Sequence, residues 1–176
     1  MLRTSLFAAI FAVVTSSSSI AQAEEAPTFK QFPAQAALPL AAPDLHKGSP
    51  FWEFRTRIRE GARTNGVTSN GGYTLVTWGF GTSLQGGVLI NRMKSKDNIT
   101  ALPLSALGYE VSFDSTMLVV NPHPEKYDDT GEIPDFLYRE FYYLVGDKFV
   151  FYCADKGDGT PCIDEKAYKA VVDAIK

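Results

Sequence analysis

Runs of β-branched and aromatic residues fill the middle and the C-terminal part of the chain, and they predict strands. The runs are residues 73–78, 87–91, 111–121, 137–145 and 148–154. Gly146 and Asp147 alone separate the last two runs, and a two-residue spacing with glycine is typical of a β-hairpin turn. The sequence therefore predicts a mostly antiparallel arrangement.

A short amphipathic helix is predicted ahead of the first strand. Ser49 is a favoured N-cap, Pro50 suits the first helical position, and Gly61 is a favoured stop. One face collects the apolar residues Phe51, Phe54 and Ile58. The other side carries Arg55, Arg57, Arg59 and Arg63. This arginine-rich face is either an anion site or, as charged helix faces commonly are, a solvated surface.

A second helix is predicted over residues 164–175. Asp164 is a suitable cap. One stripe holds the apolar residues Ile163, Ala167, Val171 and Ile175. The expected fold class is α+β: a mostly antiparallel β-sheet or small barrel, flanked by an N-terminal and a C-terminal helix.

The aromatic residues of the predicted hairpin pose a packing problem. They are Phe136, Tyr138, Phe141, Tyr142, Tyr143, Phe149, Phe151 and Tyr152. Successive strand residues face opposite sides of a sheet, so these rings cannot all enter one core. One set is expected to be exposed, unless a helix or the N-terminal leader covers it. Exposed aromatic faces of this kind are frequent interaction surfaces.

Residues 1–23 have the pattern of a secretory signal peptide. Arg3 precedes the apolar run 6–14, and Ala21 and Ala23 supply the small residues that signal peptidase requires. Residues 24–48 are rich in Ala and Pro, which indicates an extended leader, partly disordered or laid over the domain as a strap. Residues 49–176 are expected to form a single globular domain. The protein is therefore predicted to be periplasmic or secreted, with no membrane span in its mature part.

The net charge limits the class of binding partner, and the cysteines indicate the cellular compartment. The formal net charge is −3 at pH 7, and the chain has no basic run. We therefore expect no binding to nucleic acid or to an anionic membrane surface. Cys153 and Cys162 are the two cysteines of the chain, and in an exported protein they predict a disulfide. Their spacing does not fit the C-x-x-C pattern of redox pairs.

The glycine-rich segment 71–87 is the candidate functional region. Its glycines surround aromatic residues, and glycine allows either a tight turn or a close approach to a ligand. One interpretation is a loop that presents Trp78, Phe80, Thr82, Ser83 and Gln85 to a partner. The other is a tight connection between strands whose aromatic rings pack into the core.

The same segment resembles a family of uncharacterised bacterial secreted proteins. Tyr73 to Gly81, then Val88 to Ile90, then Phe113 to Val120 are similar to that family, whose segment reads G-H-Y-x-L-x-x-W-G-C-G-T-x-C. The similarity spans about residues 50–152. It implies export and a common fold, and no activity comes with it. Gly72 replaces the histidine of that pattern, and Phe80 and Leu84 replace its two cysteines, so chemistry or a disulfide at those positions is not expected here.

No catalytic set stands out in the sequence. Ser83 does not lie in a G-x-S-x-G motif, and a serine without a positioned base is a weak nucleophile. The two histidines are His46, in the leader, and His123, between two prolines. Four acidic residues near the cysteines do not match the spacing of a calcium loop: Asp155, Asp158, Asp164 and Glu165. We therefore expect neither a metal nor a cofactor.

The favoured function is that of an exported, non-enzymatic binding protein whose partner is another protein. An inhibitor or immunity protein against a cell-envelope hydrolase or toxin is its most concrete form. Two alternatives remain. The chain could be an enzyme that acts on a cell-envelope polymer through scattered carboxylates, or a structural component of the envelope.

Overall fold

Two antiparallel sheets form the centre of the structure, a computed structural model that describes residues 25–33, 40–81, 84–127, 130 and 132–175. Sheet 1 has the order β1 (Tyr73–Gly79), β2 (Gln85–Asn91), β3 (Ile99–Ala101). Sheet 2 has the order β4 (Tyr109–Val111), β5 (Met117–Val120), β6 (Arg139–Val145), β7 (Lys148–Asp155). With α1 (Arg55–Thr64) and α2 (Glu165–Ile175) they confirm the α+β class. The described strands form two sheets and no closed barrel. The predicted signal peptide lies outside the described residues.

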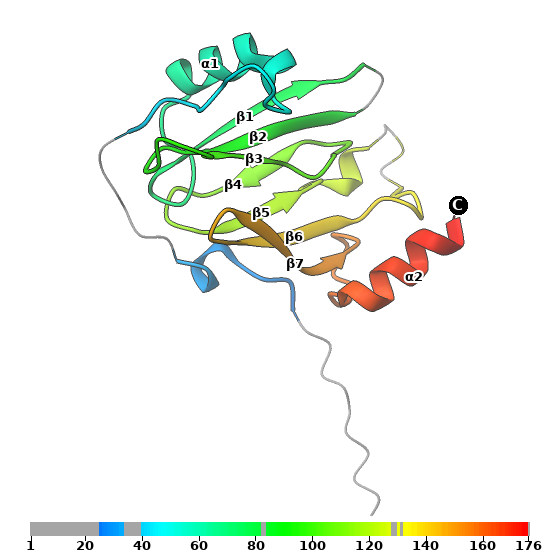
Figure 1. Ribbon diagram of the computed structural model, residues 1–176. Helices are drawn as coiled ribbons and strands as arrows, with labels where there is room; N and C mark the ends of the chain where they lie inside the picture. Colours follow the sequence, from blue (N-terminus) through cyan, green and yellow to red (C-terminus); the bar gives the residue numbers. More distant parts are fainter. Residues whose placement is uncertain (1–24, 34–39, 82–83, 128–129, 131, 176) are drawn as a thin grey trace, which may run out of the picture.

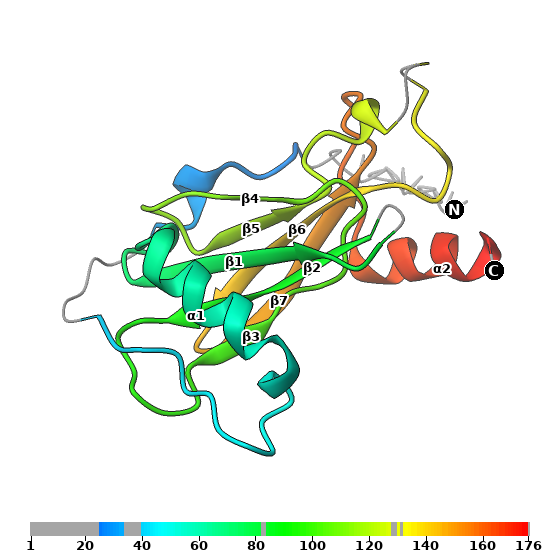
Figure 2. The same cartoon turned by 90° about the horizontal axis from the view of Figure 1, so that it is seen from above.

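The elements lie in layers, which run from top to bottom in Figure 1: α1, sheet 1, sheet 2 and the N-terminal segment. Figure 2 shows α1 crossing over β1 and β2. One apolar cluster joins α1 to the outer face of sheet 1 through Ile58, Val76 and Ile90. A second cluster, with Leu89, Leu118 and Leu144 among its members, lies between the sheets. A third covers the outer face of sheet 2.

The predicted N-terminal helix is present, but its boundaries differ. A 3₁₀ turn at Trp52–Phe54 leads into α1, and the Ser49 hydroxyl accepts a hydrogen bond from the Phe51 N–H at 3.2 Å. Gly61 does not end the helix, which runs on to Thr64. A Cβ atom at Gly61 would overlap the side chain of Val76 on β1. The glycine therefore serves close packing of α1 on sheet 1.

The strand predictions are confirmed where neighbouring residues determine the structure, as in the β6–β7 hairpin. Leu144 pairs with Phe149 and Val145 with Lys148, which confirms the hairpin turn at Gly146 and Asp147. The predicted run 111–121 is instead a hairpin of β4 and β5, with Tyr109 opposite Val120. β3 was not predicted, because its three residues are too few to show an alternating pattern.

The C-terminal helix has the predicted cap, and its main ring contact comes from Tyr168, which is not part of the predicted stripe. The Asp164 carboxylate accepts a hydrogen bond from the Ala167 N–H at 2.8 Å. Of the predicted stripe, Ile163 and Val171 are half-buried, but Ala167 is exposed. Tyr168 makes the contact: its ring stacks on Phe151 with a centroid distance of 5.4 Å and lies edge-on to Tyr138 at 5.4 Å. Ile163 pairs with Ala154 beside β7, and this pairing directs Tyr168 toward the hairpin.

Both faces of the aromatic hairpin are covered. On the inner face, Tyr142 and Phe149 pack against the cluster between the sheets. On the outer face, Phe32 stacks on Tyr143 at 5.6 Å and lies edge-on to Tyr152 at 5.4 Å. The backbone of Phe32 also accepts a hydrogen bond from the Thr116 N–H at 2.8 Å. Residues 25–33 of the Ala/Pro-rich segment are thus a strap over sheet 2, and the hairpin offers no broad exposed aromatic face.

The predicted disulfide is present between Cys153 and Cys162, whose Cα atoms are 5.7 Å apart. Cys153 is buried in the cluster under the N-terminal strap. Cys162 lies just ahead of α2. The disulfide therefore ties the start of the C-terminal helix to the last strand.

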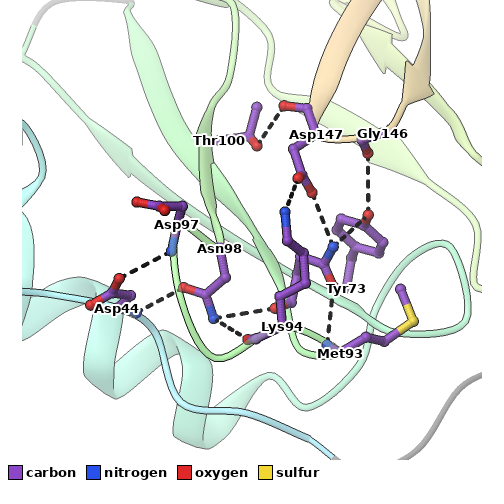
Figure 3. A network of polar contacts seen from close by, with 10 residues as sticks. Asp44, Tyr73, Met93, Lys94, Asp97, Asn98, Thr100, Gly146 and Asp147 are labelled. Atoms are coloured by element: carbon purple, nitrogen blue, oxygen red, sulfur yellow. Dashed lines mark hydrogen bonds and ion pairs between the residues drawn. The ribbon is translucent and has the colours of Figure 1, made fainter.

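A polar network joins the two sheets at the end that holds the β6–β7 turn (Figure 3). The buried Asn91 amide donates to the Tyr73 hydroxyl at 2.9 Å and to Asp147 at 3.0 Å. Lys94 pairs with the same Asp147 carboxylate. Burial, and the nearby Asp147 charge, raise the pKa of Tyr73 to about 12. The network fixes the hairpin turn of sheet 2 against the β2–β3 connection of sheet 1.

Candidate functional site

The candidate residues of the glycine-rich segment lie at the β1–β2 turn. Trp78 is half-buried on the face of sheet 1 that α1 covers, and its ring stacks on Phe54 at 4.7 Å. Phe80 follows β1, and 51% of its surface is exposed. Its ring lies edge-on to Trp78 at 6.1 Å and to Phe54 at 5.9 Å. The segment therefore combines the two interpretations: Trp78 is packed, and Phe80 is presented to solvent.

The remaining candidates do not join this aromatic group. Gln85 is the first residue of β2 and is half-buried; its backbone exchanges hydrogen bonds with Ser105 at 2.7 and 2.9 Å. Its side chain lies near Gly108. Thr82 and Ser83 lie outside the described residues.

The aromatic group borders a groove of about 170 Å³, which we call the apolar groove. Its walls come from the segment just ahead of α1, from the β1–β2 turn and from β3 with the segment after it. They include Phe54, Trp78, Phe80, Val88, Leu102 and Leu104. Leu104 is 61% exposed and was not predicted from the sequence. A Cβ atom at Gly86 would overlap the Phe80 ring, so this glycine lets the ring lie over β2.

One residue that lines the apolar groove has a side-chain polar atom without a hydrogen-bond partner. Within the described part of the chain, the indole Nε1–H of Trp78 is the one buried side-chain polar group without a hydrogen-bond partner. Native proteins rarely bury such groups, and each costs about 1–3 kcal/mol. A residue that lines the groove therefore carries a buried donor that no described group uses.

A second hollow, of about 320 Å³, is polar. It lies beside Asp44, His46, Asp97 and Asn98. Its groups already bond to one another: the Asp44 N–H donates to Asn98 at 2.8 Å, and the Asp97 N–H donates to Asp44 at 3.0 Å. These hydrogen bonds explain why polar residues lie there: they anchor the segment that precedes α1 to the β2–β3 connection.

The acidic residues near the disulfide have separate local roles. Asp155 is buried and forms an ion pair with Arg139 at 2.7 Å. Asp158 accepts a hydrogen bond from the Thr160 N–H at 3.0 Å, and Asp164 caps α2. Over the described ranges, no group of three or more His, Cys, Asp or Glu side chains is placed to hold a metal ion.

Glu140 is a half-buried carboxyl on β6. Burial raises its pKa, and hydrogen bonds from Tyr142 and Tyr168 offset this in part. The Tyr142 hydroxyl donates to its Oε2 at 2.6 Å. Burial likewise raises the pKa of Tyr142 and of Tyr168, and the negative charge of Glu140 adds to the effect. Tyr168 comes from α2, so Glu140 lies where the C-terminal helix meets the hairpin.

We expect the Glu140→Gln variant to be more stable than the natural protein at pH 8, and the difference to shrink toward pH 4. A carboxyl whose pKa is raised on folding stabilises the fold fully below its unfolded pKa, and this contribution is lost as pH rises through the folded pKa. Gln keeps the acceptor for Tyr142 and removes the buried charge. Urea unfolding at both pH values measures the difference. Glu110→Gln, at an exposed position of β4, controls for net charge, and an equal gain at both pH values would contradict the expectation.

No family model, curated protein or solved structure matches this chain. No described helix is long and apolar enough to cross a bilayer.

The Phe80→Ala variant tests whether this ring holds the fold together. Half of the Phe80 surface lies in solvent. We therefore expect Phe80→Ala to lower the unfolding free energy by less than about 1 kcal/mol. A fully buried Phe would cost about 3–5 kcal/mol. Denaturant unfolding separates the two values. Gln85→Ala is a companion variant at the same turn, and a loss above 3 kcal/mol for Phe80→Ala would make the ring part of the core.

Proposed function

We propose that this chain is an exported, non-enzymatic binding protein that docks another protein through the apolar groove. The single observation behind the proposal is the pair of exposed apolar side chains, Phe80 and Leu104, that flank a hollow lined by aromatic and aliphatic residues. Covering a large apolar side chain is worth about 1.5–3 kcal/mol. A few such anchors around one hollow are typical of the central residues of protein interfaces.

The surrounding features fit an extracytoplasmic setting. The disulfide favours an oxidising compartment. The pattern of residues 1–23 supports export to the periplasm or medium. In its most concrete form the protein is an inhibitor or immunity protein, and the β1–β2 turn with the segment after β3 enters the cleft of a cell-envelope hydrolase or toxin.

A capture experiment with matched variants tests this proposal. The mature protein, Leu104→Ser and Val145→Ser are immobilised and incubated with the envelope fraction of the source cells. Val145 is 55% exposed and lies next to the β6–β7 turn, outside the groove, so it is the matched control. We expect the natural protein and Val145→Ser to capture the same protein, and Leu104→Ser to lose it while keeping its melting temperature.

The captured protein then decides the form of the function. Inhibition of a captured hydrolase or toxin by the natural protein, and not by Leu104→Ser, supports the inhibitor role. Equal capture by all three proteins would overturn docking through the groove. Turnover of a cell-envelope polymer by the purified protein would favour an enzyme instead.

A further inference from the structure

Trp78 lines the apolar groove and carries a buried indole N–H that has no hydrogen-bond partner. An unpaired buried donor is an energetic cost that a bound acceptor would remove. A ligand in the groove would remove this cost if its acceptor reached the N–H.

The lining restricts what that group can be. The described side chains around the groove are aromatic or aliphatic, and two glycines complete the wall. A sugar would bring several hydroxyl groups into this lining and leave most of them without partners, which costs free energy for each. The volume of about 170 Å³ suits one large aliphatic side chain and is small for an acyl chain. One acceptor beside one apolar side chain is the composition of a peptide unit.

The N–H is buried, so a neighbouring group must move before an acceptor can reach it. Two rings contact the indole, Phe54 and Phe80. Phe54 belongs to the cluster that joins α1 to sheet 1. Phe80 is half-exposed and stands between Gly79 and Gly81, the latter with a φ of +106°. Of the two rings, Phe80 is the one that can swing away without disturbing the core.

We propose that an extended segment of the partner protein displaces the Phe80 ring, seats a large aliphatic side chain between Phe80 and Leu104, and accepts a hydrogen bond from Trp78 Nε1–H through a main-chain carbonyl. This inference rests on the proposed docking function and adds the chemistry of the occupant. Trp78 orients the bound segment, because its N–H donor fixes where the main-chain carbonyl lies. Phe80 and Leu104 supply the apolar contact area.

The test follows the indole signals of the ¹⁵N-labelled mature protein by NMR. The chain has two tryptophans, and Trp52→Phe assigns the signal of Trp78. The probe is capped leucine, N-acetyl-L-leucine N-methylamide, at millimolar concentration. We expect a saturable downfield shift of the Trp78 indole proton together with shifts of the Leu104 methyl signals. Capped glycine has the same carbonyls without the side chain and is expected to cause no saturable shift.

Trp78→Phe keeps an aromatic ring and removes the donor. Followed through the Leu104 methyl signals, capped leucine is expected to bind this variant about threefold to tenfold more weakly, the contribution of one neutral hydrogen bond. Unchanged affinity in Trp78→Phe, or methyl shifts without an indole shift, would overturn the role of the N–H and leave the docking proposal standing. Shifts with methyl N-acetyl-β-glucosaminide and none with capped leucine would replace the peptide by a glycan. Loss of the docking function shows separately, as equal capture by Leu104→Ser.

Discussion

Arg139→Met is expected to destabilise the protein by about 3–5 kcal/mol, the cost of leaving a buried charge without its partner. The guanidinium of Arg139 on β6 donates through Nε to Asp155 Oδ1 at 2.9 Å and through Nη2 to Oδ2 at 2.7 Å. Asp155 is 3% exposed. The Gly157 N–H also donates to Oδ1 at 3.0 Å, but a neutral donor does not balance the carboxylate charge. The pair joins the ends of β6 and β7.

Denaturant unfolding of Arg139→Met measures this cost, and Lys169→Met is the matched control. Lys169 pairs with Glu165 on the exposed side of α2. Exposed pairs of this kind contribute about 0.3–0.5 kcal/mol. The double variant Arg139→Met/Asp155→Leu should recover part of the loss, since no charge is then buried. A loss below 1 kcal/mol for Arg139→Met would show that water reaches Asp155.

Cys153→Ser is expected to cost about 2–5 kcal/mol, the usual value for a disulfide of a small secreted domain. The disulfide closes a short loop, with a sequence separation of 9 between the two cysteines. Without it, the start of α2 is held by the two backbone hydrogen bonds between Ala154 and Ile163, at 3.0 and 2.8 Å. The contact of Tyr168 with Phe151 then depends on those bonds and on the contacts of Tyr168 with Tyr138 and Glu140. The loss should therefore extend to the order of the C-terminal helix.

The natural protein in excess reductant provides the comparison for the cysteine variants. It should unfold at nearly the same denaturant concentration as Cys153→Ser and Cys162→Ser, because all three lack the same bond. Thiol titration of the untreated protein should find no free cysteine. Two free thiols in folded protein would contradict the disulfide, and a much more stable Cys162→Ser would show that the cost at Cys153 comes from packing.

The predictable parts of the fold are those set by neighbouring residues. The β6–β7 turn follows from two residues, and the cap of α2 follows from Asp164 and the N–H three residues later. Gly61 was misread, because the sequence shows that glycine favours a helix end but not that Val76 lies against it. The ion pair of Arg139 with Asp155 depends on the register of the β6–β7 hairpin. From the sequence alone, Asp155 is only an acidic residue near a turn, and its pairing with Arg139 is not indicated.

The candidate site was half predictable for the same reason. Trp78 and Phe80 are close in sequence and flanked by glycines, and together they form one wall of the groove. Leu104 reaches the groove because β2 pairs with β3 and Gln85 with Ser105. That pairing is invisible in a strand of three residues. The unpaired indole is a property of packing, and no sequence pattern indicates it.

The N-terminal strap has a consequence for how the chain folds. Phe29 and Phe32 are among the first described residues to be synthesised, yet their binding surface is built from β5, β6 and β7. Contacts between residues so far apart in the sequence form late, because the loss of chain entropy on closing the loop precedes any gain in contacts. The strap must therefore wait until almost the whole chain has been made, and docks after the sheet that it covers.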